Sequence, residues 1–415
     1  MALRRKSTDA SGSPNLISEL DLSPKKLEIF AAKALRVFAY AFISIILPVY
    51  LLRLGYPVLL VGVISSLAIG SAAVYNLFIS RYADSFGRRR LLVLLSLLMA
   101  ASGIIFALDL GTYSLVLAAL IGSISATGTE TGPFMNIETV VLAGLSTDRN
   151  RTMTFSAYNF IGYAALSLGS LFSGMPAVLA NSVGDMRMLF YVYAVIAIAL
   201  ALIYLRLGDS IEIRRKGRKL PKLGREAKSR ILHMAALFSL DAFGGGFVIQ
   251  TILALYFYKV WGLQLGSLSA IFFVSGAITA MSIFLAARIA KRIGLLNTMV
   301  LTHVPSSVFL MAIPFAPSAL DAVVLLFLRQ SISQMDVPTR QSYTMAIVKP
   351  HERTAAGSLT NTPRTIAQAI SPSIASYMLQ LSAVQLPFVI GGSLKIVYDV
   401  LVYFRFRKVK PPEES

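Results

Sequence analysis

Twelve apolar stretches, each long enough to cross a lipid bilayer as a helix, constrain this chain more than any other feature. A bilayer core about 30 Å thick needs roughly 20 apolar residues in helical form. The stretches cover residues 29–52, 57–80, 91–109, 113–145, 152–174, 188–207, 230–258, 265–287, 295–315, 318–348, 354–380 and 384–404. Only 14% of the 415 residues are charged, which is too few for a soluble protein of this length. The pattern predicts an all-α membrane protein with 12 transmembrane helices.

Positive charge gathers in alternate connections between these spans. Most of the 39 Lys and Arg residues fall on one side of the predicted membrane, whereas the other side carries only Arg53, Arg187 and Lys259. Basic connections stay in the cytoplasm, so both termini are predicted to be cytoplasmic. The net charge of +19 therefore reflects topology, and we expect no nucleic-acid partner.

The spans divide into six plus six, separated by one strongly basic connection. We expect a cytoplasmic tail, a six-helix bundle, a basic cytoplasmic linker, a second six-helix bundle and a short tail, with bounds at 1–28, 29–207, 208–229, 230–407 and 408–415.

The two halves also resemble each other in sequence. An offset of 202 places Arg151–Asn159 on Arg353–Asn361 with Arg, Thr, Ser and Asn in common, and an offset of 205 pairs two phenylalanines of the first span with two of the seventh. Matches at nearly one offset indicate duplication. The sequence thus predicts two pseudo-symmetric bundles.

The connection between the second and third spans reads R-Y-A-D-S-F-G-R-R-R. It resembles the loop between helices 2 and 3 of the major facilitator superfamily (MFS), whose pattern is roughly G-x-x-x-D-R-x-G-R-R/K. Asp84, Gly87, Arg88 and Arg89 fit that pattern, and Arg288–Gly294 is a degraded second copy. With the six-plus-six arrangement, the resemblance extends over nearly the whole chain.

This resemblance implies a central cavity that opens alternately to each side of the membrane. Spans 1, 4, 7 and 10 would line the cavity, and spans 2, 5, 8 and 11 would form the moving interface. It also implies a conformational latch, in which Asp84 faces span 11 and Arg88 and Arg89 hold the cytoplasmic side closed. The alternative is a loop that only fixes topology.

Charged residues inside the spans are functional candidates, because each costs about 2.5–3.5 kcal/mol on insertion scales. They fall on the spans that the resemblance assigns to the cavity. Span 1 carries Arg36, span 4 carries Glu130 and Glu138, span 7 carries Asp241, and span 10 carries Arg329, Asp336 and Arg340.

Glu130 is the first candidate for proton coupling. It lies in T-G-T-E-T-G-P, where two glycines and Pro133 weaken the helix. A carboxylate in such a dry, flexible place can exchange a proton near neutral pH. The alternative is a structural acid or an arginine partner. Glu138 is expected nearer the cytoplasm, as a gate or packing acid.

Two further sets of charges have alternative interpretations. Arg36 and Asp241 correspond at the offset of 205, so they either pair across the cavity or have separate local partners, which we favour. Asp336 and Arg340 are four residues apart on one helix face. They form an internal ion pair or, alternatively, a substrate anchor in which Arg340 accepts an anion.

Enzymatic and ATP-driven functions have little support. The chain has no phosphate-binding Gly-rich loop, no cysteine and only three scattered histidines, so no cofactor or metal is expected. We expect a monomeric secondary active transporter of a small solute in the plasma membrane, resembling the drug and metabolite efflux branch and exporting by proton coupling. The alternatives are a proton-coupled importer of a nutrient or organic anion and a non-transporting receptor on the same scaffold.

Overall fold

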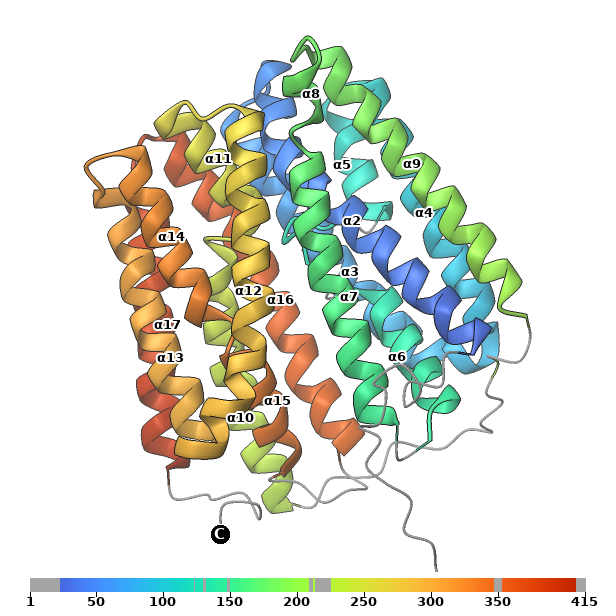
Figure 1. Ribbon diagram of the computed structural model, residues 1–415, viewed down its shortest axis with the longest axis vertical. Helices are drawn as coiled ribbons and strands as arrows, with labels where there is room; N and C mark the ends of the chain where they lie inside the picture. Colours follow the sequence, from blue (N-terminus) through green and yellow to red (C-terminus); the bar gives the residue numbers. More distant parts are fainter. Residues whose placement is uncertain are drawn as a thin grey trace, which may run out of the picture.

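The computed structural model describes residues 23–122, 124–129, 132–147, 150–208, 212, 225–346 and 353–407, and the regular elements within these ranges are helices (Figure 1). The first half contains α2 (Pro24–Arg53), α3 (Val58–Phe86), α4 (Arg88–Leu108), α5 (Thr112–Ile121), α6 (Pro133–Leu145), α7 (Arg151–Phe172), α8 (Met175–Val178) and α9 (Val183–Arg206). The second half contains α10 (Arg225–Gly246), α11 (Gln250–Trp261), α12 (Leu265–Ile293), α13 (Leu295–Ala312), the 3₁₀-helix η2 (Ile313–Phe315), α14 (Ala319–Ser333), α15 (Asp336–Ala346), α16 (Arg353–Gln380) and α17 (Leu386–Phe406).

Each of the 12 predicted spans corresponds to one helix or to consecutive helices. Within the described part of the chain, nine stretches are individually long and apolar enough to cross a membrane. The other three are span 4, which is divided into α5 and α6, span 10, which is divided into α14 and α15, and span 11, whose helix α16 is more polar. The prediction of 12 transmembrane helices is confirmed.

The break in span 4 lies where the sequence predicts a weak helix. Gly128 has a positive φ of 71°, which side-chain-bearing residues rarely adopt, and Pro133 begins α6. Span 7 is likewise divided, because α10 ends in the glycine run at Gly246. A Cβ on Gly246 would lie 2.6 Å from the carbonyl oxygen of Gln368, so only glycine permits this approach to α16.

The breaks of spans 4 and 7 meet at Thr251. Its backbone N–H donates to the carbonyl of Ala126 at 3.2 Å. Its hydroxyl lies 2.8 Å from the same oxygen and 2.9 Å from the carbonyl oxygen of Ser44 on α2, so it can donate to either. Broken helices leave backbone groups without intrahelical partners, and in a membrane protein these groups must be satisfied by the protein itself. Thr251 therefore joins the two halves of the chain.

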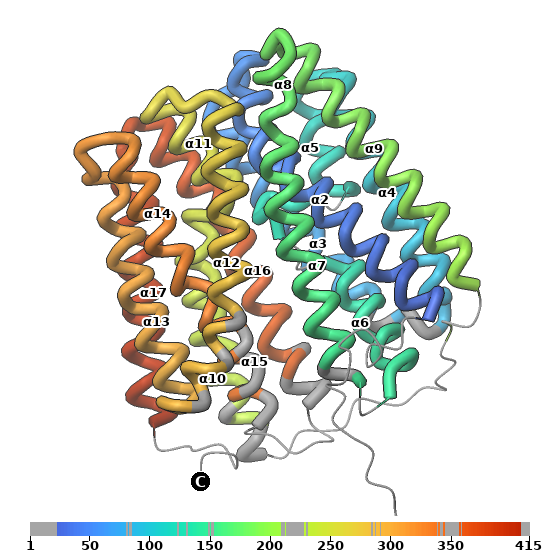
Figure 2. Tube along the Cα trace, in the orientation of Figure 1, coloured from blue at the N-terminus to red at the C-terminus, as the bar shows by residue number. Residues whose placement is uncertain are grey.

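The halves form two bundles, coloured blue to green and yellow to red in Figure 2. Helix α3 packs on α16, and α7 packs on α12. Ser66 and Ser373 hydroxyls lie 2.8 Å apart, and the Ser167 hydroxyl donates to the carbonyl of Phe273 at 2.7 Å. These contacts lie toward the far end of the molecule, which we define as the end opposite the start of α2 and the end of α17. Spans 2, 5, 8 and 11 thus form the interface, as the family resemblance implies.

The outer surface of the bundles is apolar. Leu168, Val195 and Leu202 are more than half exposed, on α7 and α9. Large apolar surfaces of this kind need a covering, and a bilayer supplies it. The core of the first bundle instead surrounds α2, most of whose residues are buried.

The interface between α3 and α16 can be tested by cross-linking, since the chain contains no cysteine. The double variant Ser66→Cys with Ser373→Cys is expected to form a disulfide on mild oxidation, because the two hydroxyls are 2.8 Å apart. The readout is loss of labelling by a maleimide reagent. The matched pair Ser65→Cys with Ser373→Cys should remain labelled, because the Ser65 hydroxyl bonds to Val61 within α3. Equal cross-linking in both pairs would contradict this packing.

Candidate functional site

Arg36 and Glu138 form a buried ion pair in the first bundle. The two nitrogens Nη1 and Nη2 of Arg36, on α2, donate to the two carboxylate oxygens of Glu138, on α6, at 3.0 and 2.5 Å. Both side chains are 0% exposed. This geometry is the two-pronged match that makes Arg–carboxylate pairs strong and specific.

Aromatic residues complete the surroundings of this pair. Tyr158 and Tyr204 donate their hydroxyls to Glu138 at 2.6 and 2.7 Å, and the guanidinium of Arg36 lies 4.7 Å from the centre of the Phe134 ring. Arg36 and Glu138 neutralise each other, and each of the two carboxylate oxygens of Glu138 accepts two hydrogen bonds. The first bundle therefore offers a closed, satisfied pair.

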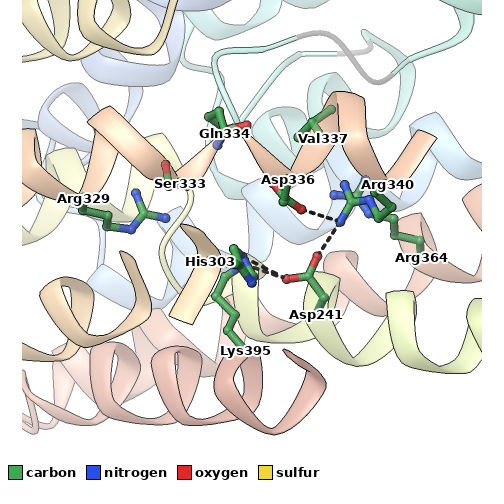
Figure 3. A pocket seen from close by; sticks show the side chains of 10 residues that line it. All are labelled: Asp241, His303, Arg329, Ser333, Gln334, Asp336, Val337, Arg340, Arg364 and Lys395. Atoms are coloured by element: carbon green, nitrogen blue, oxygen red, sulfur yellow. Dashed lines mark hydrogen bonds and ion pairs between the residues drawn. The ribbon is translucent and has the colours of Figure 1, made fainter. Parts of the chain in front are cut away.

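The second bundle holds a larger charged cluster around Asp241 of α10 (Figure 3). Arg340 donates to Asp241 at 3.0 Å, and Lys395 of α17 donates to the other carboxylate oxygen at 2.8 Å. Arg340 also pairs with Asp336, four residues earlier on α15, at 3.1 Å. The predicted ion pair within span 10 is thus present, but Arg340 divides its charge between two carboxylates.

His303 of α13 connects this cluster to a third buried carboxylate. Its Nδ1 lies 2.9 and 3.0 Å from the two oxygens of Asp399. Its Nε2 lies 3.3 Å from Nζ of Lys395 and 3.7 Å from Oδ1 of Asp241. With Asp399 ionised, its carboxylate can only accept, so Nδ1 of His303 carries the hydrogen. Nε2 of a neutral imidazole then accepts from the lysine.

The two clusters occupy matching places in the two halves. Asp241 corresponds to Arg36 at the offset of 205, and Arg340 corresponds to Glu138 at 202. Each bundle therefore has an ion pair between its first helix and the second piece of its broken fourth helix, α2 with α6 and α10 with α15. The arginine is on the first helix in one bundle and on the fourth helix in the other. Arg36 and Asp241 each have a partner within their own bundle, Glu138 and Arg340. A pairing of Arg36 with Asp241 across the cavity stays a prediction.

A cavity of about 70 Å³ lies beside the second cluster. Its walls come from five spans, and its lining is Asp241, His303, Arg329, Ser333, Gln334, Asp336, Val337, Arg340, Arg364 and Lys395. In Figure 3 these side chains surround the junction between α14 and α15. Four arginine or lysine side chains face two carboxylates there, so the cavity has excess positive charge.

The remaining predicted site residues lie elsewhere or outside the described part. Glu130 is outside the described residues, as is the side chain of Asp84, so proton coupling at Glu130 and the latch stay predictions. Gly87 joins α3 to α4 with a positive φ of 96°. The backbone N–H groups of Arg88 and Arg89 donate to the carboxylate of Glu212, from the linker, at 2.8 and 3.0 Å.

His303, Arg364 and Lys395 were not predicted as members of one site. Lys395 and Asp399 are four residues apart on α17 and could be taken for an internal pair, but each has a partner on another helix. The available signal is ionisable side chains within the spans, because His303 lies in the middle of α13 and Lys395 lies in the middle of α17.

The pair in the first bundle should be structural, and Glu138→Gln tests this. Removing one partner of a buried ion pair costs about 3–5 kcal/mol, because the other charge stays buried. We expect a large fall in the thermal denaturation temperature of the detergent-purified protein. Tyr204→Phe, which removes the hydroxyl that donates to Glu138 and accepts from Arg36, should cost less, about 1–3 kcal/mol. The double variant Arg36→Met with Glu138→Met should recover most of the loss, and failure to recover would show that the pair has a role beyond stability.

Comparison with known proteins places this architecture in a family. A family model described as Major Facilitator Superfamily matches residues 29–335 and 242–415. An uncharacterized membrane protein of Saccharomyces cerevisiae is 25% identical over 416 residues, covering 91% of this chain and 93% of that protein. The nucleoside transporter NupG superposes with a TM-score of 0.74 at 13% identity, over 92% of this chain and 100% of that one. A D-xylose-proton symporter superposes with a TM-score of 0.70 at 15% identity, over 94% and 98%. The chain belongs to the major facilitator superfamily and has its fold of 12 transmembrane helices in two pseudo-symmetric bundles.

Proposed function

We propose that this protein is a proton-coupled secondary active transporter that moves a small solute by alternating access. Membership of the superfamily indicates a membrane transporter rather than an enzyme. The observation that carries the finer proposal is the buried cluster of Asp241, His303 and Asp399, which lies beside a polar cavity. Buried titratable groups in a membrane protein are the usual means of exchanging protons.

His303 is the group whose protonation would change the contacts of this cluster. In the neutral state Nε2 accepts from Lys395, which leaves Lys395 bridging His303 and Asp241. A proton on Nε2 removes the hydrogen bond from Lys395, because Nε2 can no longer accept. The imidazolium then repels the Lys395 ammonium group and directs a new N–H toward Asp241. Histidine and lysine then compete for one carboxylate, so protonation loosens α17 from α10.

Such a change acts on contacts between three helices of the second bundle. His303, Asp241 and Lys395 come from α13, α10 and α17. A coupling ion can shift a conformational equilibrium only if it binds the two conformations with different affinity. Contacts that differ between protonation states supply that difference.

The contacts at the far end support a particular state of the cycle. The bundles are joined there by α3 with α16, α7 with α12, and Thr251. With the basic segments at the opposite end in the cytoplasm, this arrangement corresponds to a cavity closed to the outside. We place the protein in the plasma membrane with both termini cytoplasmic, and as a monomer.

The direction of transport has two candidates. Efflux follows from the resemblance of the sequence to the efflux branch. Uptake of an organic anion together with a proton is favoured by the excess of positive side chains around the cavity. Protonation makes such a cavity more positive, so a proton and an anion would bind together, which is the thermodynamic requirement for symport.

Proton coupling can be measured in liposomes that enclose a pH-sensitive dye. Pooled solutes, including sugars, nucleosides, carboxylates and amphipathic cations, are added outside under an imposed pH gradient. His303→Gln is expected to abolish solute-dependent proton movement, because the amide keeps polar contacts but does not titrate. Solute exchange in the absence of a gradient should persist in the variant.

The matched control is His233→Gln, which changes an exposed histidine on α10 and should leave proton movement intact. Glu130→Gln is the competing variant. Proton movement lost there and retained in His303→Gln would move the coupling site to Glu130. No flux with any pool would favour the receptor alternative.

A further inference from the structure

We infer that the cavity at the junction of α14 and α15 binds the oxyanionic group, a carboxylate or phosphate, of a small organic anion. Arg329 and Arg364 would be its principal ligands. The inference rests on the proposed transport function and names the class of solute that the site would take. It depends on the charges, the partners and the size of the cavity.

The balance of charge around the cavity is positive. Arg329, Arg340, Arg364 and Lys395 face it, against the carboxylates of Asp241 and Asp336. The ion pairs account for only part of this set. Asp241 serves Arg340 and Lys395, and Asp336 serves Arg340. Both acids are thereby used, and two arginines remain.

Those two arginines lack the partner that buried cations normally have. Among the residues that the structure describes, neither Arg329 nor Arg364 forms an ion pair, and Nε of each is buried without a hydrogen-bond acceptor. Arg329 is only 9% exposed, and its one side-chain bond is to Gln330 at 2.9 Å. An unpaired buried charge costs several kcal/mol, so a site that keeps it gains when an anion enters.

The position of the two arginines suits a ligand held between them. In Figure 3 the guanidinium of Arg329 lies on one side of the α14–α15 junction, and that of Arg364 lies on the other side, next to Arg340. Ser333 and Gln334, at the end of α14, add uncharged polar groups to the lining. Guanidinium groups match carboxylate and phosphate oxygens with two parallel donors each.

The volume limits what can enter. One water needs about 10–15 Å³ of such space, so the cavity of about 70 Å³ holds roughly five waters. That is room for one anionic group of a few heavy atoms.

Proton and anion binding should reinforce each other. The charged and titratable groups that face His303 are those of Asp241, Arg329, Arg340, Tyr398, Lys395 and Asp399. A proton taken up by this cluster adds positive charge to the cavity. An anion should therefore bind more tightly at mildly acidic than at mildly alkaline pH.

The test is thermal stabilisation of the full-length, detergent-purified protein by small anions at matched ionic strength. Succinate, glycerol 3-phosphate and inorganic phosphate are the probes, with xylose and choline as the neutral and cationic comparisons. A ligand that binds only the folded state raises the denaturation temperature in proportion to its occupancy. We expect stabilisation by at least one anion and by neither comparison solute, and we expect it to increase at acidic pH. Succinate acting alone would identify a carboxylate site, and the two phosphate compounds acting alone would identify a phosphate site.

The variants Arg329→Gln and Arg364→Gln should each weaken anion binding about tenfold or more, since each removes a charge-assisted hydrogen-bond donor. Arg329→Lys should recover part of the affinity. Arg206→Gln, an exposed arginine on α9, is the control and should bind as the unmodified protein does. Without ligand, Arg329→Gln should be no less stable than the unmodified protein, because it removes an unpaired buried charge, whereas a purely structural role for Arg329 predicts a loss of stability.

The outcomes separate this inference from the proposed function. Anion binding that requires Arg329 and Arg364 supports the inference even if liposomes show no proton-coupled flux. Proton-coupled flux of a neutral or cationic solute, with no anion binding, would overturn the inference and leave the transport function standing. Equal stabilisation of the unmodified protein and of both arginine variants would also overturn it.

Discussion

The rest of the structure depends on one interaction that occurs in both bundles. It is a buried ion pair that joins the first helix of the bundle to the second piece of its broken fourth helix. Helices α6 and α15 are short, and each follows a break, so continuity of the backbone does not fix their direction. The pair Arg36–Glu138 ties α6 to α2, and the pair Asp241–Arg340 ties α15 to α10. A buried charge left without its partner costs several kcal/mol, so each pair favours one position and rotation of its half-helix.

The same interaction has different surroundings in the two bundles. In the first bundle two tyrosine hydroxyls complete the carboxylate, and no capacity is left. In the second bundle the tyrosines at the carboxylate are replaced by Lys395 and the neighbouring His303. Arg329 and Arg364 also line the cavity, and they form no ion pair with any residue that the structure describes. The first bundle thus holds a neutral ion pair, whereas the second bundle holds a cluster with excess positive charge.

Sequence reasoning reached the architecture because the membrane imposes length and charge rules that can be read locally. Span length, the distribution of basic residues and the repeated offset gave the 12 helices and the two bundles. The Asp336–Arg340 pair followed from spacing along one helix. The partners of His303 and Lys395 could not be predicted in this way. Contacts between different helices depend on how each helix is rotated about its axis, and residue spacing within one helix does not determine that rotation. The hydrogen bond that the Arg88 backbone N–H donates to Glu212 could not be predicted either, because linker and helix are far apart in sequence.

Thr251 sets a condition on any movement that separates the bundles at the far end. The carbonyl oxygen of Ala126 depends on this residue for its hydrogen bonds, and the hydroxyl of Thr251 has one proton to share between Ala126 and Ser44. Separation therefore leaves the carbonyl oxygens of Ala126, in the break of span 4, and of Ser44, on α2, without the hydrogen bond from Thr251 unless water replaces it. Opening of this joint therefore requires that water reach these backbone atoms as Thr251 leaves them.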